Sequence, residues 1–212
     1  MNYIENIYIC LTGPILLAFV CLRGSQRRSI LFVLGGVTAC LLSSYISTFL
    51  AAVYGASLFT ASLEITPMVE ELMKLLPVLF YLLVFEPEKE EIAGGALMVA
   101  LGFATFENVC YLSANGATRL LHLLIRGFGT GAMHVVCGTI VEIGIVYLWD
   151  RFWLRVAGMF GLLSVAITYH GIYNILVSQT DLAALIGYLI PLLTAVLLLI
   201  IRRHILRYRV LA

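Results

Sequence analysis

The stretch ITPMVEELMKLLPVLFYLLVF, residues 65–85, decides how the fold must be built. It is long and apolar enough to cross a bilayer, because about 20 apolar residues span the hydrocarbon core. It nevertheless carries Glu70, Glu71 and Lys74 within five positions. Each charge at mid-membrane costs roughly 2.5–3.5 kcal/mol on the insertion scale, so three of them cancel the gain from the apolar residues. We therefore expect this helix to turn its polar side towards other helices or towards water that they enclose.

The composition of the chain is that of an integral membrane protein. Of its 212 residues, 62% are hydrophobic and 12% are charged, about half the charged fraction of a soluble domain. The mean hydropathy is +1.03. A net charge of +1 argues against nucleic acid as a partner. The five cysteines lie in apolar stretches and form no CxxC pair, so we expect neither disulfides nor a thiolate metal site.

The apolar stretches predict an all-α, polytopic membrane helix bundle of about seven transmembrane helices, in a single domain over residues 1–212. The expected spans are residues 6–22, 30–54, 64–85, 92–112, 127–148, 156–177 and 183–201. The segment 120–126 is either an interfacial turn or the start of a long, tilted fifth span. The polar motifs lie within 64–177, where glycines allow helices to approach closely, and the spans in 6–54 and 183–201 are expected to be scaffold.

The basic residues predict the orientation, because Lys and Arg accumulate in cytoplasmic loops. With the N-terminus outside and the C-terminus cytoplasmic, Arg119 is the one basic residue in an outside loop. We expect Arg126, at an outer boundary, to extend towards the headgroups. The basic residues expected on the cytoplasmic side are Arg23, Arg27, Arg28, Lys89, Arg151, Arg155, Arg202, Arg203, Arg207 and Arg209.

Three further spans carry polar side chains, and an ionisable residue inside a span suggests a functional site. The stretches are GFATFENVCY (102–111), TGAMHVVCGTIVEIG (130–144) and ITYHGIYNIL (167–176). At 1.5 Å per residue, one level about 7–12 Å below the outer surface holds Glu70, Glu71, Glu107, His134 and His170. A shared depth predicts that these residues build one site. Glu142 lies two turns deeper than His134, and we expect it to have a structural or supporting role.

Carboxylates and imidazoles in a low-dielectric pocket suit hydrolysis by either of two routes. In the first, a Zn²⁺ ion with three His or Glu ligands lowers the pKa of a bound water to about 7; the candidate ligands are Glu107, His134 and His170. In the second, a glutamate deprotonates water directly. In either route, His170 and Asn174 could donate hydrogen bonds to the developing oxyanion. The zinc signature HExxH is absent from the sequence, and both routes stay open.

The two adjacent glutamates are equivalent at this level of analysis. The sequence leaves open which of Glu70 and Glu71 is the base. Lys74 lies on the same helix face as Glu70, at the i,i+4 spacing that favours an ion pair. We expect Lys74 to hold one of the carboxylates ionised and fixed.

A proton-coupled membrane transporter is the alternative from another functional class, because intramembrane Glu and His chains also relay protons. Such a relay should cross the membrane, whereas the polar cluster is expected at one level. The chain also lacks paired broken helices in two matching halves, which indicate transporter sites. These observations favour an enzyme.

Four motifs follow one another on successive spans: EELMK (70–74) matches EExxK, FATFEN (103–108) matches FxxxEN, HVVCG (134–138) matches HxxxG and HGIYN (170–174) matches HxxxN. Together they resemble the PrsW family of intramembrane proteases, which is related to the CAAX prenyl endopeptidase superfamily. The catalytic residues that the resemblance implies are Glu70, Glu71, Glu107, His134, His170 and Asn174. The supporting residues are Lys74, Asn108 and Phe103.

The resemblance also implies a biological role. A protease of this type in the bacterial plasma membrane makes the first cut in a single-span, membrane-anchored anti-sigma factor, on its extracytoplasmic side. Further proteolysis then releases an ECF sigma factor in a stress response. The family is classed with metalloproteases, which makes Zn²⁺ the candidate cofactor. A CAAX-protease-like or bacteriocin-processing membrane peptidase is the alternative within the same class.

Overall fold

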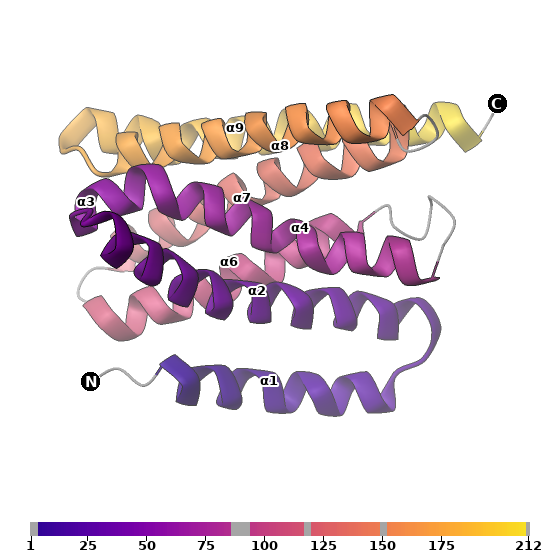
Figure 1. Cartoon of the computed structure of the whole chain (residues 1–212), viewed down its shortest axis with the longest axis horizontal. Coiled ribbons are helices and arrows are strands. Elements are labelled where there is room, and N and C mark those ends of the chain that lie inside the picture. Colours follow the sequence, from indigo (N-terminus) through magenta and orange to yellow (C-terminus); the bar gives the residue numbers. More distant parts are fainter. Residues whose placement is uncertain (1–3, 86–93, 117–119, 149–151, 211–212) are drawn as a thin grey trace.

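The computed structural model describes residues 4–85, 94–116, 120–148 and 152–210, and within these ranges the chain is helical with no strands. The long helices lie side by side as a bundle, with α1 at one edge and α8 and α9 at the other (Figure 1). The elements are α1 (Ile4–Cys21), α2 (Gly24–Tyr54), α3 (Leu58–Thr60), η1 (Ala61–Ile65), α4 (Thr66–Phe85), α6 (Gly95–Asn115), α7 (Leu120–Leu148), α8 (Phe152–Val177) and α9 (Asp181–Val210).

The prediction of an all-α, multi-pass membrane protein is confirmed. Six of the described helices, α1, α2, α6, α7, α8 and α9, are long and apolar enough to cross a membrane. The 20-residue α4 is the seventh long helix among the described residues, and it differs from the six because three charged side chains lie within five positions of its apolar stretch. The segment 120–126 is helical, because α7 begins at Leu120. The fifth span is therefore long, as one of the two alternatives had it.

The positions of the two chain ends are consistent with an odd number of membrane crossings. The start of α1 and the end of α9 lie at opposite ends of the molecule (Figure 1). Which end faces the cytoplasm stays a prediction from the basic residues. Of these, Lys89, Arg119 and Arg151 lie outside the described residues, as do the side chains of Arg202, Arg203, Arg207 and Arg209.

Helix α4 begins irregularly, and this sets the position of its charged residues. The three-residue α3 and the five-residue π-helix η1 lead directly into it. A π-helical turn shifts the register of the side chains that follow, and such turns are frequent at functional sites. The amide of Asn174 on α8 donates a hydrogen bond to the carbonyl oxygen of Ser62 in η1, at 2.9 Å. Helix α8 therefore holds the turn that precedes Glu70.

Helices α2 and α6 make a close backbone contact. A Cβ atom at Gly36 would lie 2.0 Å from the carbonyl oxygen of Val99, and one at Gly102 would lie 2.2 Å from that of Val33. The two helices therefore approach as closely as glycine permits. Helix α2 therefore holds the helix that carries Glu107, which is consistent with a scaffold role.

Helix α7 is fixed against α6 at two points. A Cβ atom at Gly138 would lie 2.8 Å from the side chain of Ala100. Further along α7, the buried Glu142 accepts a hydrogen bond from the backbone N–H of Gly94 at 2.9 Å, just before α6 begins. Glu142 thus has the structural role expected for it, which is to tie the start of α6 to α7.

Candidate active site

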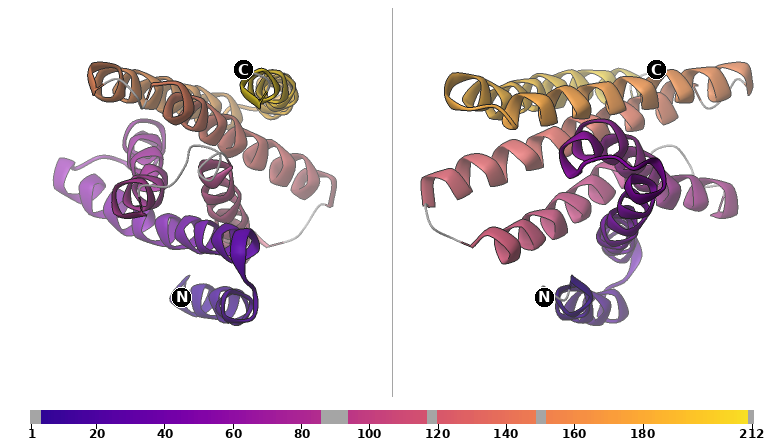
Figure 2. Two further views of the ribbon diagram at one scale, coloured as in Figure 1. Left: turned by 90° about the vertical axis from the view of Figure 1, so that its right-hand side faces the viewer. Right: turned by 60° about the vertical axis from the view of Figure 1, so that its left-hand side comes forward.

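Polar side chains from four helices meet inside the bundle. Helix α4 contributes Glu70, Glu71 and Lys74, while α6, α7 and α8 contribute one residue each. Helix α7 lies between α6 and α8 (Figure 2), and α4 contacts all three. The residues that the shared depth predicted to form one site are therefore in mutual contact. The contributed residues on α6, α7 and α8 are Glu107, His134 and His170.

Lys74 is the centre of a buried hydrogen-bonded chain. Its ammonium lies 2.6 Å from Oε1 of Glu71 and 2.8 Å from Nδ1 of His134. Nε2 of His134 in turn lies 2.5 Å from Oε2 of Glu107. Because an ammonium has no acceptor, Nδ1 of His134 must accept and Nε2 must carry the proton. Lys74 thus holds one of the two carboxylates, as expected, and the structure identifies that carboxylate as Glu71, at i,i+3 rather than the i,i+4 position of Glu70.

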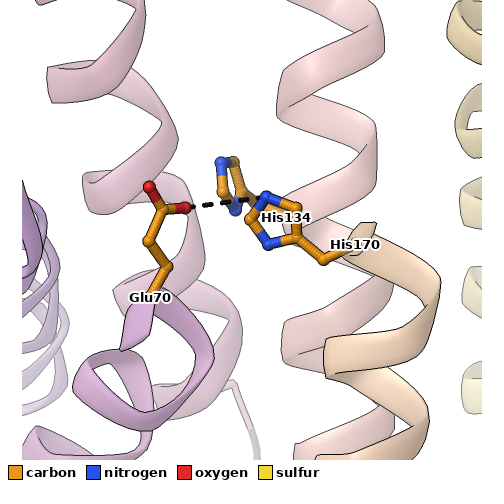
Figure 3. Close-up of side chains that lie close together, drawn as sticks. All are labelled: Glu70, His134 and His170. Atoms are coloured by element: carbon orange, nitrogen blue, oxygen red, sulfur yellow. Dashed lines mark ion pairs between the residues drawn. The ribbon is translucent and has the colours of Figure 1, made fainter. Parts of the chain in front are cut away.

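His170 has the opposite tautomer. Its Nδ1 lies 2.7 Å from Oε1 of Glu71. An ionised carboxylate only accepts, so Nδ1 carries a proton, and in the neutral imidazole Nε2 then keeps its lone pair. That Nε2 lies 3.6 Å from Oε2 of Glu70, which points at it from the facing helix (Figure 3). Glu71 thereby orients the imidazole, and Glu70 faces the free nitrogen.

The adjacent glutamates differ sharply in their surroundings. The side chain of Glu71 is 2% exposed, and one of its oxygens accepts from both Lys74 and His170. The side chain of Glu70 is 12% exposed, and among the residues that the structure describes it makes no hydrogen bond. Its Oε2 lies 3.6 Å from Nε2 of His170. Of the two, Glu70 has the carboxylate that is available to a water, a metal ion or a substrate.

Arg126 on α7 closes the cluster beside Glu107, which is the most exposed member at 29%. One guanidinium nitrogen lies 3.4 Å from Oε1 of Glu107, and another donates to Oδ1 of Asn108. The guanidinium also stacks 3.5 Å above the ring of Tyr111. The expectation that Arg126 extends to the headgroups is wrong, because its side chain is 11% exposed and turned inwards. The fifth span was expected to start at residue 127, which placed Arg126 outside the helix. In the structure, α7 begins six residues before Arg126, so its side chain projects from within the helix.

Two of the remaining predicted residues occupy different positions. Phe103 is fully buried, with its ring centroid 5.0 Å from that of His134 and 5.1 Å from the ammonium of Lys74. It lines the cluster, as a supporting residue should. The amide of Asn174 instead donates to Ser62, away from the two imidazoles. The expected pairing of Asn174 with His170 as oxyanion donors is therefore not what the structure shows.

The cluster includes a donor set for a metal ion. Ligand atoms of Glu70, His134 and His170 lie within 4.8 Å of one another, and two histidines with one glutamate form a known catalytic zinc set. The predicted set had Glu107 in place of Glu70. His170 fits well, because a carboxylate orients its other nitrogen, as second-shell groups of zinc ligands do. His134 uses both ring nitrogens, so it would bind an ion only by releasing Glu107 or Lys74.

The charges of the cluster also suit a cation. Three carboxylates, on Glu70, Glu71 and Glu107, face two fixed cations, Lys74 and Arg126. With all five groups ionised, one negative charge is left over in a largely buried site. A divalent cation offsets such an excess, and an ionised carboxylate that is buried without a partner is costly. The donor set, its spacing and its charge therefore fit a catalytic metal.

The comparisons with known proteins agree with this geometry. Neither the curated proteins nor the solved structures include a match to the chain. Among protein families, residues 28–201 match the PrsW family intramembrane metalloprotease. The matched region runs from the start of α2 into α9 and includes every residue of the cluster. The match identifies a peptidase and sets aside the transporter, and the chain belongs to the PrsW family of intramembrane metalloproteases.

Proposed function

We propose that this intramembrane protease makes the first cut in a single-span, membrane-anchored anti-sigma factor, on its extracytoplasmic side. Further proteolysis of the remnant then releases an ECF sigma factor as part of a stress response. The observation that carries the proposal is the cluster of Glu70, His134 and His170, enclosed by membrane helices and next to the partly exposed Glu107. We also propose that residues 1–212 form one protease domain in a bacterial plasma membrane.

The position of the cluster along the helices supports a cut near the outer surface. Glu107 lies eight residues before the end of α6 at Asn115, and His170 lies seven before the end of α8 at Val177. At 1.5 Å per residue, both are about 10–12 Å from those ends. The basic residues predict that these ends face outwards. A peptide bond presented there belongs to the part of a single-span substrate that leaves the membrane on the extracytoplasmic side.

Glu70 is the proposed base. Its carboxylate is accessible and faces Nε2 of His170, so a water between the two can lose a proton to Glu70 while the imidazole accepts a hydrogen bond. The N–H of His134 is the matching donor for the oxyanion that forms on the scissile carbonyl. The substrate oxygen would replace Glu107 at that N–H, and Arg126 would keep the displaced carboxylate neutralised.

A metal ion would be held by Glu70, His134 and His170. When bound, it supplies Lewis-acid polarisation of the scissile carbonyl and a lower pKa for an attacking water. Glu71 would orient His170 and Arg126 would offset charge with or without the ion, whereas His134 would have to release Lys74 or Glu107 to bind it. A change at Glu70 therefore removes activity whether or not a metal ion is bound. Only metal analysis distinguishes the metal-dependent route from the metal-free one.

The deciding experiment is a cleavage assay with purified protein in lipid nanodiscs and candidate single-span anti-sigma factors. We expect the wild type and Glu64→Gln to cut on the extracytoplasmic side, and Glu70→Gln to leave the substrate intact. Glu64 is a matched control, because it is an exposed glutamate on η1 six residues earlier. A cut at the cytoplasmic side, or cleavage only of prenylated peptides or bacteriocin precursors, would overturn the proposed substrate in favour of the alternative peptidases.

A further inference from the structure

A long apolar groove runs between α2 and α4, away from the catalytic cluster. Its volume is about 460 Å³, and its lining includes Leu31, Leu34, Leu42, Leu76, Phe80 and Tyr81. Several of these side chains are open to the outside of the bundle: Leu76 is 53% and Phe80 is 63% exposed. In a membrane helix bundle such a face meets lipid, so the groove opens to the bilayer.

The groove continues into a basic hollow at the start of α2. A second cavity of about 440 Å³ is lined by Gly24, Ser25, Arg27 and Arg28, and it shares Leu31, Tyr81 and Phe85 with the groove. Arg27 is held over the ring of Phe19 on α1, with its guanidinium carbon 4.4 Å from the ring centroid. Both arginines lie in the first turns of α2, where the helix dipole also favours an anion. The combined feature is therefore an apolar channel with a cationic end.

The dimensions of the groove match an acyl chain. From Leu31 to Leu42 it follows α2 for about 17 Å at 1.5 Å per residue, close to half of the roughly 30 Å hydrocarbon core. Apolar side chains from both helices line the groove along that length, so it offers an acyl chain a nearly continuous apolar surface.

We propose that this channel binds an acidic glycerophospholipid, with an acyl chain between α2 and α4 and the phosphate at Arg27 and Arg28. Charge complementarity selects the headgroup, because basic pockets between membrane helices bind anionic lipids. The expected orientation places the site in the cytoplasmic leaflet. The bound lipid would brace α4 on the face opposite its buried Lys74, through Met73, Leu76 and Phe80.

The first test compares lipids of equal chain length. The full chain is purified in detergent, loaded with phosphatidylglycerol or phosphatidylcholine, and analysed by native mass spectrometry. We expect the wild type to retain phosphatidylglycerol at least fivefold better than phosphatidylcholine. Arg27→Gln/Arg28→Gln should lose that preference, whereas Arg23→Gln should keep it, because the exposed Arg23 precedes α2 and does not line the hollow. Equal retention of both lipids by the wild type, or loss of the preference in Arg23→Gln as well, would overturn the proposal.

The second test addresses the groove itself and does not depend on the headgroup. Leu31→Trp fills the groove, and Leu101→Trp is the control, since the two leucines are 40% and 39% exposed and Leu101 lies on α6 outside the groove. We expect only Leu31→Trp to reduce lipid retention. A photo-crosslinker at Leu76 should yield an adduct with the mass of one phospholipid. An adduct with a second polypeptide would assign the groove to a protein partner instead. All of these readouts are independent of proteolysis.

Discussion

Exchanging the carboxylates of Glu70 and Glu71 for amides, one at a time, separates catalysis from structure. Glu71→Gln leaves the ammonium of Lys74 7% exposed and without its 2.6 Å counter-ion. Breaking a buried ion pair from one side costs about 3–5 kcal/mol, a large part of a typical stability of 5–15 kcal/mol. Glu70→Gln removes no hydrogen bond among the described residues, so its stability should change by less than about 1 kcal/mol. Its turnover should fall by about 10²–10⁴, as for the loss of a general base.

The assay pairs thermal unfolding in mild detergent with turnover of a membrane-anchored substrate. Glu71→Gln/Lys74→Met is the informative control, because removing both charges leaves no unpaired ion and should restore most of the stability. Its activity should stay low, since His134 and His170 both lose the partner that fixes their tautomer. Wild-type turnover in Glu70→Gln, together with a stable but inactive Glu71→Gln, would refute the assignment and make Glu71 the base.

Three further changes follow from the contacts. Gly36→Ala should destabilise the bundle by about 1–3 kcal/mol or more, because its Cβ would meet a carbonyl oxygen at 2.0 Å; Gly161→Ala on α8, with nothing within 4 Å, should be neutral in the same unfolding assay. Arg126→Gln should lower turnover by about 10–100-fold, the usual effect of losing a supporting contact, and Arg126→Lys should recover little if the contacts to Glu107 and Asn108 both matter. If a metal is resident, elemental analysis should find one ion per chain, and chelation should abolish activity that zinc restores; full activity in metal-free protein would establish direct activation of water by Glu70.

The fold could be predicted from hydropathy, and the residues that form the site could be predicted from the motifs. Runs of apolar residues locate the long helices, since only lengths of about 20 can cross the bilayer. Helices α2, α7 and α9 extend six to nine residues beyond the expected spans. The rise per residue of a helix is fixed, so the depth of each side chain in the membrane could be calculated from the sequence. Those depths predicted that Glu70, Glu107, His134 and His170 lie close together. Hydropathy and depth are both properties of a single helix, so neither prediction required knowledge of how the helices pack.

The contacts between side chains on different helices could not be predicted in this way. Adjacent residues on a helix point about 100° apart, so whether Glu70 or Glu71 faces the pocket depends on the rotation of α4. The π-turn in η1 and its contact with Asn174 set that rotation, and hydropathy does not detect either. Arg126 was misplaced for a related reason, because the apolar character of 127–148 concealed the helix that precedes it.

In the EExxK motif, the second glutamate and the lysine determine which nitrogen of each imidazole carries a proton. Lys74 can only donate, so it makes Nδ1 of His134 an acceptor and leaves a proton on Nε2. Glu71 can only accept, so it fixes a proton on Nδ1 of His170 and leaves a lone pair on Nε2. One imidazole therefore offers a donor and the other an acceptor, with Glu70 facing the acceptor. Hydrolysis requires this asymmetry, because the attacking water must lose a proton on one side while the carbonyl oxygen gains a hydrogen bond on the other.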